Sequence, residues 1–364
     1  MPYLALDPCK RKISRLDTVT IPLLTCARTG TGCMLPGVKA GACPFPASAG
    51  SYPIIRRMEM NKTIQCATGN HISGKTMLAL LAVVFTICAW AVSLPAQTEP
   101  QKAPPQYVYW SNSNNATIGR ATTTGTGATE DFITTGEGVG GGGLTVDTNY
   151  IYWTGANGGS ATNIGRANLD GTGVNDTFIT GATNPCGVAV STTYIYWAGD
   201  VGSFIGRANL NGTGVNQDFI ETGNGVCGVA VTASHIYWAN YETQSIGRAK
   251  INGTQVEDSF ISGAGSGSGI AIHGGYIYFT SNGGTGIGRA KVAGTEVNPN
   301  FITGLNGEIA FLAVSAKGIF WADWGSRGSG TTIGHANLDG TGVNQSFITG
   351  TDGGFGIAVT KGNP

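Results

Sequence analysis

One basic residue recurs at the same place in a short repeated motif, and this pattern has the clearest chemical potential in the chain. The motif is IGRA, with IGHA as its last copy, and the recurring residues are Arg120, Arg166, Arg207, Arg248, Arg289 and His335. A ring of guanidinium groups could bind an anion through its many N–H donors. Packing between identical units, with each arginine donating to a loop carbonyl, would require the same regularity. We therefore interpret the six residues as a structural ring.

Catalysis would need unlike groups that converge, and the sequence offers few of them. Four carboxylates do not repeat and could hold a divalent cation: Asp147, Asp200, Glu308 and Asp323. Hard cations need several oxygen ligands at once, and nothing in the sequence brings these four together. None of the histidines is paired in sequence with a plausible nucleophile. We expect no catalytic residue, no bound metal and no cofactor.

The recurring arginines belong to a repeat that occurs six times after residue 106. Each copy opens with an aromatic strand, VYW, IYW, IYF or IFW, and successive strands are 43, 44, 41, 41 and 42 residues apart. IGRA follows, then a Gly-containing turn such as DG or NG, then FIT, and finally a short apolar run such as GVAV. Each copy therefore supplies four short strands separated by turn residues.

Four strands in about forty residues form one blade of a β-propeller, and six blades close into a ring. The repeats begin with an aromatic strand at residue 107 and end with GIAV at residues 356–359. We therefore predict an all-β, six-bladed β-propeller of four-stranded blades, in which the C-terminal strand completes the first blade. This closure leaves no open sheet edge.

The chain before the repeats has a different character. Residues 1–106 contain 11 Lys and Arg against 4 Asp and Glu, whereas residues 107–364 contain 10 against 17. An acidic propeller is a poor partner for a phosphate backbone, so we expect no nucleic-acid binding. Residues 77–91, MLALLAVVFTICAWA, follow Lys75 without a charge and are typical of a signal peptide.

These features divide the chain into four parts. Residues 1–57 are a doubtful or disordered leader, residues 58–96 a signal-peptide region, residues 97–106 a Pro-rich linker and residues 107–364 the propeller. We expect a secreted or extracytoplasmic protein whose mature chain starts between Val92 and Gln97. The alternative is a membrane protein anchored by residues 77–96, whose charge-free run is about long enough to span a bilayer.

The order IYW, IGRANLDGTG, FIT and GVAV resembles the YWTD or class B repeat of the low-density-lipoprotein receptor family, over Tyr107 to Pro364. The resemblance implies one six-bladed propeller, and it does not carry the biology of the receptors with it. The family's Asp after Tyr-Trp-Thr is kept only at Asp323, so five blades must replace or lose its hydrogen bonds. A different class stays open, namely a gluconolactonase-like or lyase-like propeller enzyme that uses a divalent cation.

The six copies differ most in the loops between the aromatic strand and IGRA, which are the second and third strands of a blade counted from the axis. Individual contacts can be placed there on a constant scaffold. Charged and aromatic residues interrupt these small, polar loops, and we predict that they bind a protein or an extracellular polymer. The predicted binding residues are Asp200, Phe204, Tyr241, Glu242, Asp323, Trp324 and Arg327.

Cys186 and Cys227 occupy matching positions just before the GVAV strands of neighbouring blades. Equivalent atoms of neighbouring blades in a sixfold ring are as far apart as they are from the axis, and a disulfide needs Cα atoms within roughly 7 Å. The sequence therefore leaves two possibilities, a disulfide or two small buried thiols.

Overall fold

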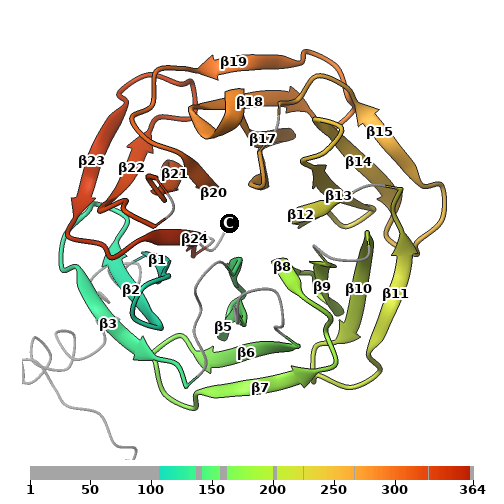
Figure 1. Cartoon of the computed structure of the whole chain (residues 1–364), viewed down its shortest axis with the longest axis horizontal. Coiled ribbons are helices and arrows are strands. Elements are labelled where there is room, and N and C mark those ends of the chain that lie inside the picture. Colours follow the sequence, from blue (N-terminus) through green and yellow to red (C-terminus); the bar gives the residue numbers. More distant parts are fainter. Residues whose placement is uncertain are drawn as a thin grey trace, which may run out of the picture. The chain divides into compact units, whose positions relative to one another are not determined.

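The computed structural model describes residues 106–136, 142–155, 162–199, 203–223, 225–265, 267–326 and 328–360. These residues form six four-stranded antiparallel sheets arranged around a central axis (Figure 1). The six-bladed propeller predicted from the repeats is confirmed. The expectations for the leader and the signal peptide fall on residues outside the described ranges.

Every blade has the same order, with its first strand at the axis and its fourth at the rim. From inner to outer strand, the blades are β24 (Gly354–Val359), β1 (Tyr107–Asn112), β2 (Thr117–Thr122) and β3 (Thr129–Thr134); β4 (Leu144–Val146), β5 (Tyr150–Thr154), β6 (Asn163–Asn168) and β7 (Asn175–Thr180); β8 (Pro185–Val190), β9 (Tyr194–Gly199), β10 (Phe204–Asn209) and β11 (Asn216–Glu221); β12 (Val226–Val231), β13 (His235–Asn240), β14 (Ser245–Lys250) and β15 (Glu257–Ile261); β16 (Ile270–His273), β17 (Tyr276–Ser281), β18 (Gly286–Lys291) and β19 (Asn298–Ile302); and β20 (Ile309–Ser315), β21 (Gly318–Asp323), β22 (Thr332–Ala336) and β23 (Asn344–Thr349).

The ring is closed by the last strand of the chain, as the repeat boundaries predict. β24 pairs antiparallel with β1, with Val359 opposite Val108 and Ile357 opposite Trp110. Beyond the strand, the Thr360 N–H donates to the Tyr107 carbonyl at 2.9 Å. The first blade therefore combines both ends of the repeat region and has no open inner edge.

The second-strand tryptophans form the core between blades. Trp110 is fully buried and belongs to the same cluster as Phe320 and Ile333 of the preceding blade. Each indole lies flat over the glycine of the IGRA motif in its own blade, as Trp197 does over Gly206. A Cβ atom on Gly206 would lie 2.2 Å from the Trp197 ring, so this glycine is required by close approach.

We expect Gly206→Ala to destabilise the propeller by about 2 kcal/mol, because the added methyl group must displace the indole in a close-packed core. Urea unfolding followed by tryptophan fluorescence measures the change. The same substitution in a Trp197→Leu background is the control, and there it should cost less than about 1 kcal/mol because the ring is gone. Equal costs in the two backgrounds would contradict the proposed contact.

Different residues occupy the position at which the class B repeat has its aspartate. Asn112 donates to the Glu130 carbonyl at 3.2 Å, and Ser281 donates to the Pro299 carbonyl at 2.7 Å. Asn240 likewise donates to the Asp258 carbonyl. Each of these bonds ties the second strand to the fourth. Two blades have glycine at this position, Gly155 and Gly199, and no side chain there can make the bond.

The described residues contain a single helical turn, η1 (Asn282–Gly284). Within the part of the chain that the structure describes, no helix is long and apolar enough to cross a membrane.

Candidate binding face

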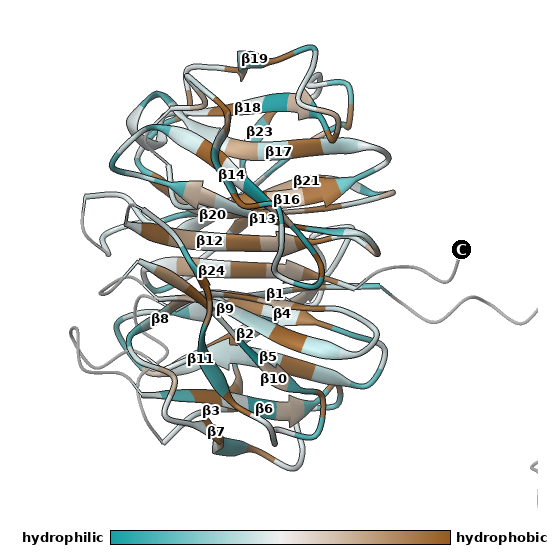
Figure 2. Ribbon diagram, turned by 90° about the vertical axis from the view of Figure 1, so that its right-hand side faces the viewer, coloured by the Kyte–Doolittle hydropathy of each residue, from teal (hydrophilic) through white to brown (hydrophobic). Residues whose placement is uncertain are grey.

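The two ends of the ring are built differently. Because the strands of a blade are antiparallel, successive connections alternate between the ends (Figure 2). The turn face carries the first-to-second and third-to-fourth turns. The variable face carries the second-to-third loops, the connections into the next blade and the strand ends that adjoin them. Its described connections include residues 113–116, 241–244, 282–285, 303–308, 324–326, 328–331 and 350–353.

The recurring arginines do not converge on a common point. Each lies on the third strand of its blade, stacked on the fourth-strand phenylalanine, as Arg166 is on Phe178 at 3.8 Å. On its other side lies the first tyrosine of the second strand, Tyr150, at 4.1 Å. The same sandwich holds Arg120, Arg207 and Arg289, whereas Arg248 stacks on Phe260 alone and forms an ion pair with Glu257.

The arginine layer also joins neighbouring blades. Arg289 donates to the Leu338 carbonyl in the turn of the next blade at 3.3 Å. His335, which replaces the arginine in the last copy, stacks on Phe347 at 4.7 Å and donates from Nε2 to the Lys317 carbonyl at 3.1 Å. The stacking holds each guanidinium group in its own blade, and Arg289 also bonds to the next blade.

Burial also affects the tyrosines that face the arginine layer. Burial raises the pKa of the tyrosine at the third position of five second strands, and the neighbouring arginines lower the pKa by less. These residues are Tyr109, Tyr152, Tyr196, Tyr237 and Tyr278. A raised folded-state pKa means that the neutral phenol is favoured by folding. The resulting stability is fully present below the unfolded pKa of about 10 and is lost as the pH rises through the folded values.

We therefore expect the propeller to unfold in alkaline solution together with phenol ionisation. Parallel measurements of tyrosinate absorbance and near-ultraviolet circular dichroism against pH should show coincident transitions above about pH 10. Ionisation of these phenols with an unchanged dichroism spectrum would show that they are not buried.

Among the described residues, those that line the axial channel include no acidic, basic or thiol side chain. The channel encloses about 110 Å³ and is lined by three residues from each inner strand, nearly all Val, Ile, Leu or Ala. Thr145 supplies the one polar side chain of this lining. A channel with these walls provides no acid, base or nucleophile for a reaction.

The four unrepeated carboxylates are not gathered at one site. Asp147 lies on the turn face, where it accepts from the Asn149 and Tyr150 N–H groups and from the Tyr152 hydroxyl. Glu308 and Asp323 lie on the opposite, variable face, and Asp200 lies outside the described residues. In the described ranges, no three Asp, Glu, His or Cys side chains are placed to hold a metal ion. The separation of Asp147 from Asp323 rules out one site built from all four.

A cluster of aromatic residues lies where the channel meets the variable face. Phe311 and Phe355 have ring centroids 5.4 Å apart, and Trp324 meets Phe355 edge to face at 5.4 Å. Cys186, Cys227 and Tyr241 belong to the same apolar cluster. We call Phe311, Phe355, Trp324, Tyr241 and the two cysteines the axial cluster.

Sequence reasoning missed two members of the axial cluster, although the repeat contains a signal for one. The residue before the channel-lining aliphatic is glycine in five inner strands: Gly143, Gly187, Gly228, Gly269 and Gly356. These glycines let neighbouring inner strands approach, as Gly187 does to the Cys227 carbonyl. In β20 the position is Phe311, and this single exception supplies one ring of the axial cluster.

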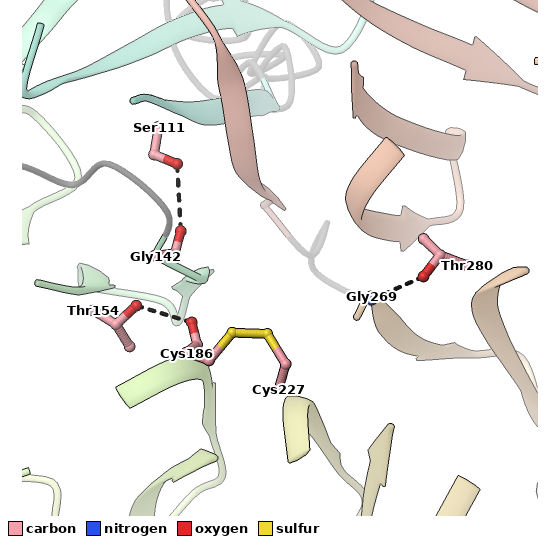
Figure 3. Close-up of a disulfide and its surroundings, with 7 residues drawn as sticks. All are labelled: Ser111, Gly142, Thr154, Cys186, Cys227, Gly269 and Thr280. Carbon is pink, nitrogen blue, oxygen red and sulfur yellow. Dashed lines mark hydrogen bonds between the residues drawn. A yellow bond between two sulfur atoms is a disulfide. The ribbon is translucent and has the colours of Figure 1, made fainter. Parts of the chain in front are cut away.

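Cys186 and Cys227 form a disulfide within the axial cluster (Figure 3). Their Cα atoms are 4.9 Å apart, which joins β8 and β12 of neighbouring blades close to the axis. The Cys186 carbonyl also accepts from the Thr154 hydroxyl at 3.0 Å and from the Gly143 N–H at 2.6 Å. Three blades are therefore tied together at this end of the channel.

The predicted binding residues occupy different environments. Tyr241 and Trp324 are half-buried on the variable face, and Glu242 is exposed beside Tyr241. Asp323 organises its own loop, accepting from the Gly325 N–H at 2.9 Å and the Thr332 hydroxyl at 3.4 Å, and burial raises the pKa of its carboxyl. Asp200 and Arg327 lie outside the described residues.

Phe204 requires a correction. We expected it to interrupt a polar loop, but it begins β10 and is only 6% exposed. Its ring packs over Gly199 of the paired strand, in one cluster with Ile164 and Ile179 of the preceding blade. Glycine at Gly199 leaves space that the phenylalanine fills, so Phe204 stabilises the core and is not available to a partner.

Comparison with known proteins shows similarity in structure alone. No protein-family model matches the chain, and no curated protein gives a significant match. A chain in the crystal structure of a nidogen/laminin complex is similar to this one, with a TM-score of 0.57 and 16% sequence identity. The match covers 70% of this chain and 98% of that chain. It confirms the propeller fold that the class B repeat pattern implies.

Proposed function

We propose that this chain is an exported, non-catalytic binding module that engages a protein or an extracellular polymer through its variable face. The observation that carries the proposal is the axial cluster, which places Trp324 and Tyr241 on the end of the ring where the six copies differ. Half-buried aromatic side chains held by a rigid scaffold are typical anchors of an interface. On the turn face, by contrast, most third-to-fourth turns keep a Gly-Thr core.

The structural neighbour supports a protein partner in general terms. It comes from a complex of nidogen with laminin, which is a setting in which one protein binds another. For this chain, the apolar channel lining and the scattered carboxylates favour binding over catalysis.

Two features support export. The charge-free segment at residues 77–91 is typical of a signal peptide, and the Cys186–Cys227 disulfide is typical of an oxidising compartment. Amino-terminal sequencing of secreted material should find a start between Val92 and Gln97. Secreted chains that retain residues 1–57 would contradict this processing.

The binding proposal is tested by affinity capture from the extracellular medium, followed by titration of the captured partner against variants. Trp324→Ala and Tyr241→Ala should each weaken binding by more than about 1 kcal/mol, because each removes an aromatic anchor. Lys317→Ala on the turn face is the control and should leave the affinity unchanged. Melting temperatures, measured in parallel, separate lost contacts from lost folding. Unchanged affinity in both aromatic variants would move the site elsewhere.

A further inference from the structure

The axial cluster is surrounded by negative charge. Among the described residues, the connections and adjoining strand ends of the variable face contain the acids Glu221, Glu242, Glu308, Asp323 and Asp352, and they contain no Lys or Arg. The basic residue that the sequence places in these loops is Arg327, outside the described ranges. The described lysines, Lys250, Lys291 and Lys317, lie on the turn face, and the described arginines are stacked within the blades.

The acids are close neighbours of the aromatic anchors in two blades. The Glu308 carbonyl accepts from the Trp324 N–H at 2.9 Å, and Asp323 precedes Trp324 in the chain. In the blade of β12 to β15, Tyr241 and Glu242 both lie over Gly225, two residues before Cys227 of the disulfide. An apolar centre with an acidic surround is therefore built from two different blades.

The two acids that matter most are not used by the scaffold. Glu242 and Glu308 are exposed, and within the described part of the molecule neither carboxylate makes a hydrogen bond or an ion pair. By comparison, Asp176 and Asp258 of the outer strands accept the Gly136 and Gly223 N–H groups of neighbouring blades. The negative charge of Glu242 and Glu308 is therefore available to attract a partner.

From this arrangement we propose that the partner presents Lys or Arg side chains, on an extended polypeptide segment, to the axial cluster. The inference rests on the proposed binding function and adds the chemistry of the partner. Ammonium and guanidinium groups bind the faces of Trp and Tyr rings, and neighbouring carboxylates strengthen the attraction and the rate of encounter. An anionic polymer would be repelled by the same surface.

The test uses the full chain and two fluorescent nonapeptides that differ only in three positions, filled by lysine in one and by glutamate in the other, among glycine and serine. Fluorescence anisotropy should show binding of the lysine peptide that weakens as salt is added, and weaker or absent binding of the glutamate peptide. Equal binding of the two peptides would overturn the proposal.

A charge-matched pair of variants locates the site. The double substitution Glu242→Gln and Glu308→Gln should weaken binding of the lysine peptide about fivefold or more. The control double substitution, Asp170→Asn and Asp339→Asn, removes the same charge from the turn face and should change it less than about twofold. It introduces the asparagine that two other copies have at the same position, Asn211 and Asn252. Equal effects of the two doubles would show non-specific attraction and would overturn the site.

The outcomes for the two proposals are distinguishable. If a captured partner depends on Trp324 but not on Glu242 and Glu308, the binding face stands and the basic partner is wrong. If the lysine peptide depends on Glu242 and Glu308 while the captured partner is indifferent to Trp324 and Tyr241, the peptide reports charge alone and the proposed function fails.

Discussion

Deletion of residues 355–364 is expected to lower the melting temperature by at least about 10 °C or to prevent folding. The deletion removes β24, whose Ile357 and Val359 are 3% and 6% exposed. Burial of these side chains and of Ala358 stabilises the ring by roughly 5 kcal/mol. The loss also exposes the inner edge of β1, which is now hydrogen-bonded along its length. Differential scanning calorimetry measures the change.

A shorter truncation provides the control. Removing residues 361–364 leaves β24 and the bond from the Thr360 N–H to the Tyr107 carbonyl intact, so its melting temperature should match that of the full chain. If the long deletion also melted like the full chain, closure by the C-terminal strand would contribute nothing and the closure argument would fail.

Replacing both Cys186 and Cys227 with serine is expected to destabilise the propeller by about 2–4 kcal/mol. The disulfide closes a loop with a sequence separation of 41, and a cross-link of this length restricts the unfolded chain substantially. Serine fits the space at both positions, because the small residues Ser268 and Ala310 occupy the equivalent positions in two other copies of the repeat. Chemical unfolding with and without a reductant measures the effect.

The reductant supplies the internal comparison. It should lower the stability of the natural chain to that of the double serine variant and leave the variant unchanged. Peptide mass spectrometry without reduction should find the two cysteines linked. A natural chain whose stability is the same with and without reductant would contradict a stabilising disulfide.

Much of the fold follows from local sequence in this protein. The residue types of one repeat specify four strands, and an isolated blade cannot bury both of its faces, so six copies require a closed ring. The partial blade at Tyr107 and the leftover strand at Val359 even determine how the ring closes. The stacking of Arg166 between Tyr150 and Phe178 also repeats with the sequence, so it could be anticipated as a structural ring.

The tertiary structure decided which of the residues that depart from the repeat pattern lie close together, and the repeat pattern alone could not show this. Phe204 looks like a loop aromatic in the sequence, but Gly199 on the paired strand creates the space that buries it. Phe311 and Phe355 are 44 positions apart and belong to different strands, yet their rings lie 5.4 Å from each other because both inner strands run along the same axis. Short-range pattern sets strands and turns, whereas the curvature of the closed ring sets the distances among side chains near its centre. For this reason the sequence by itself determined the propeller, and the ring geometry determined the axial cluster, its disulfide and the acidic surface around it.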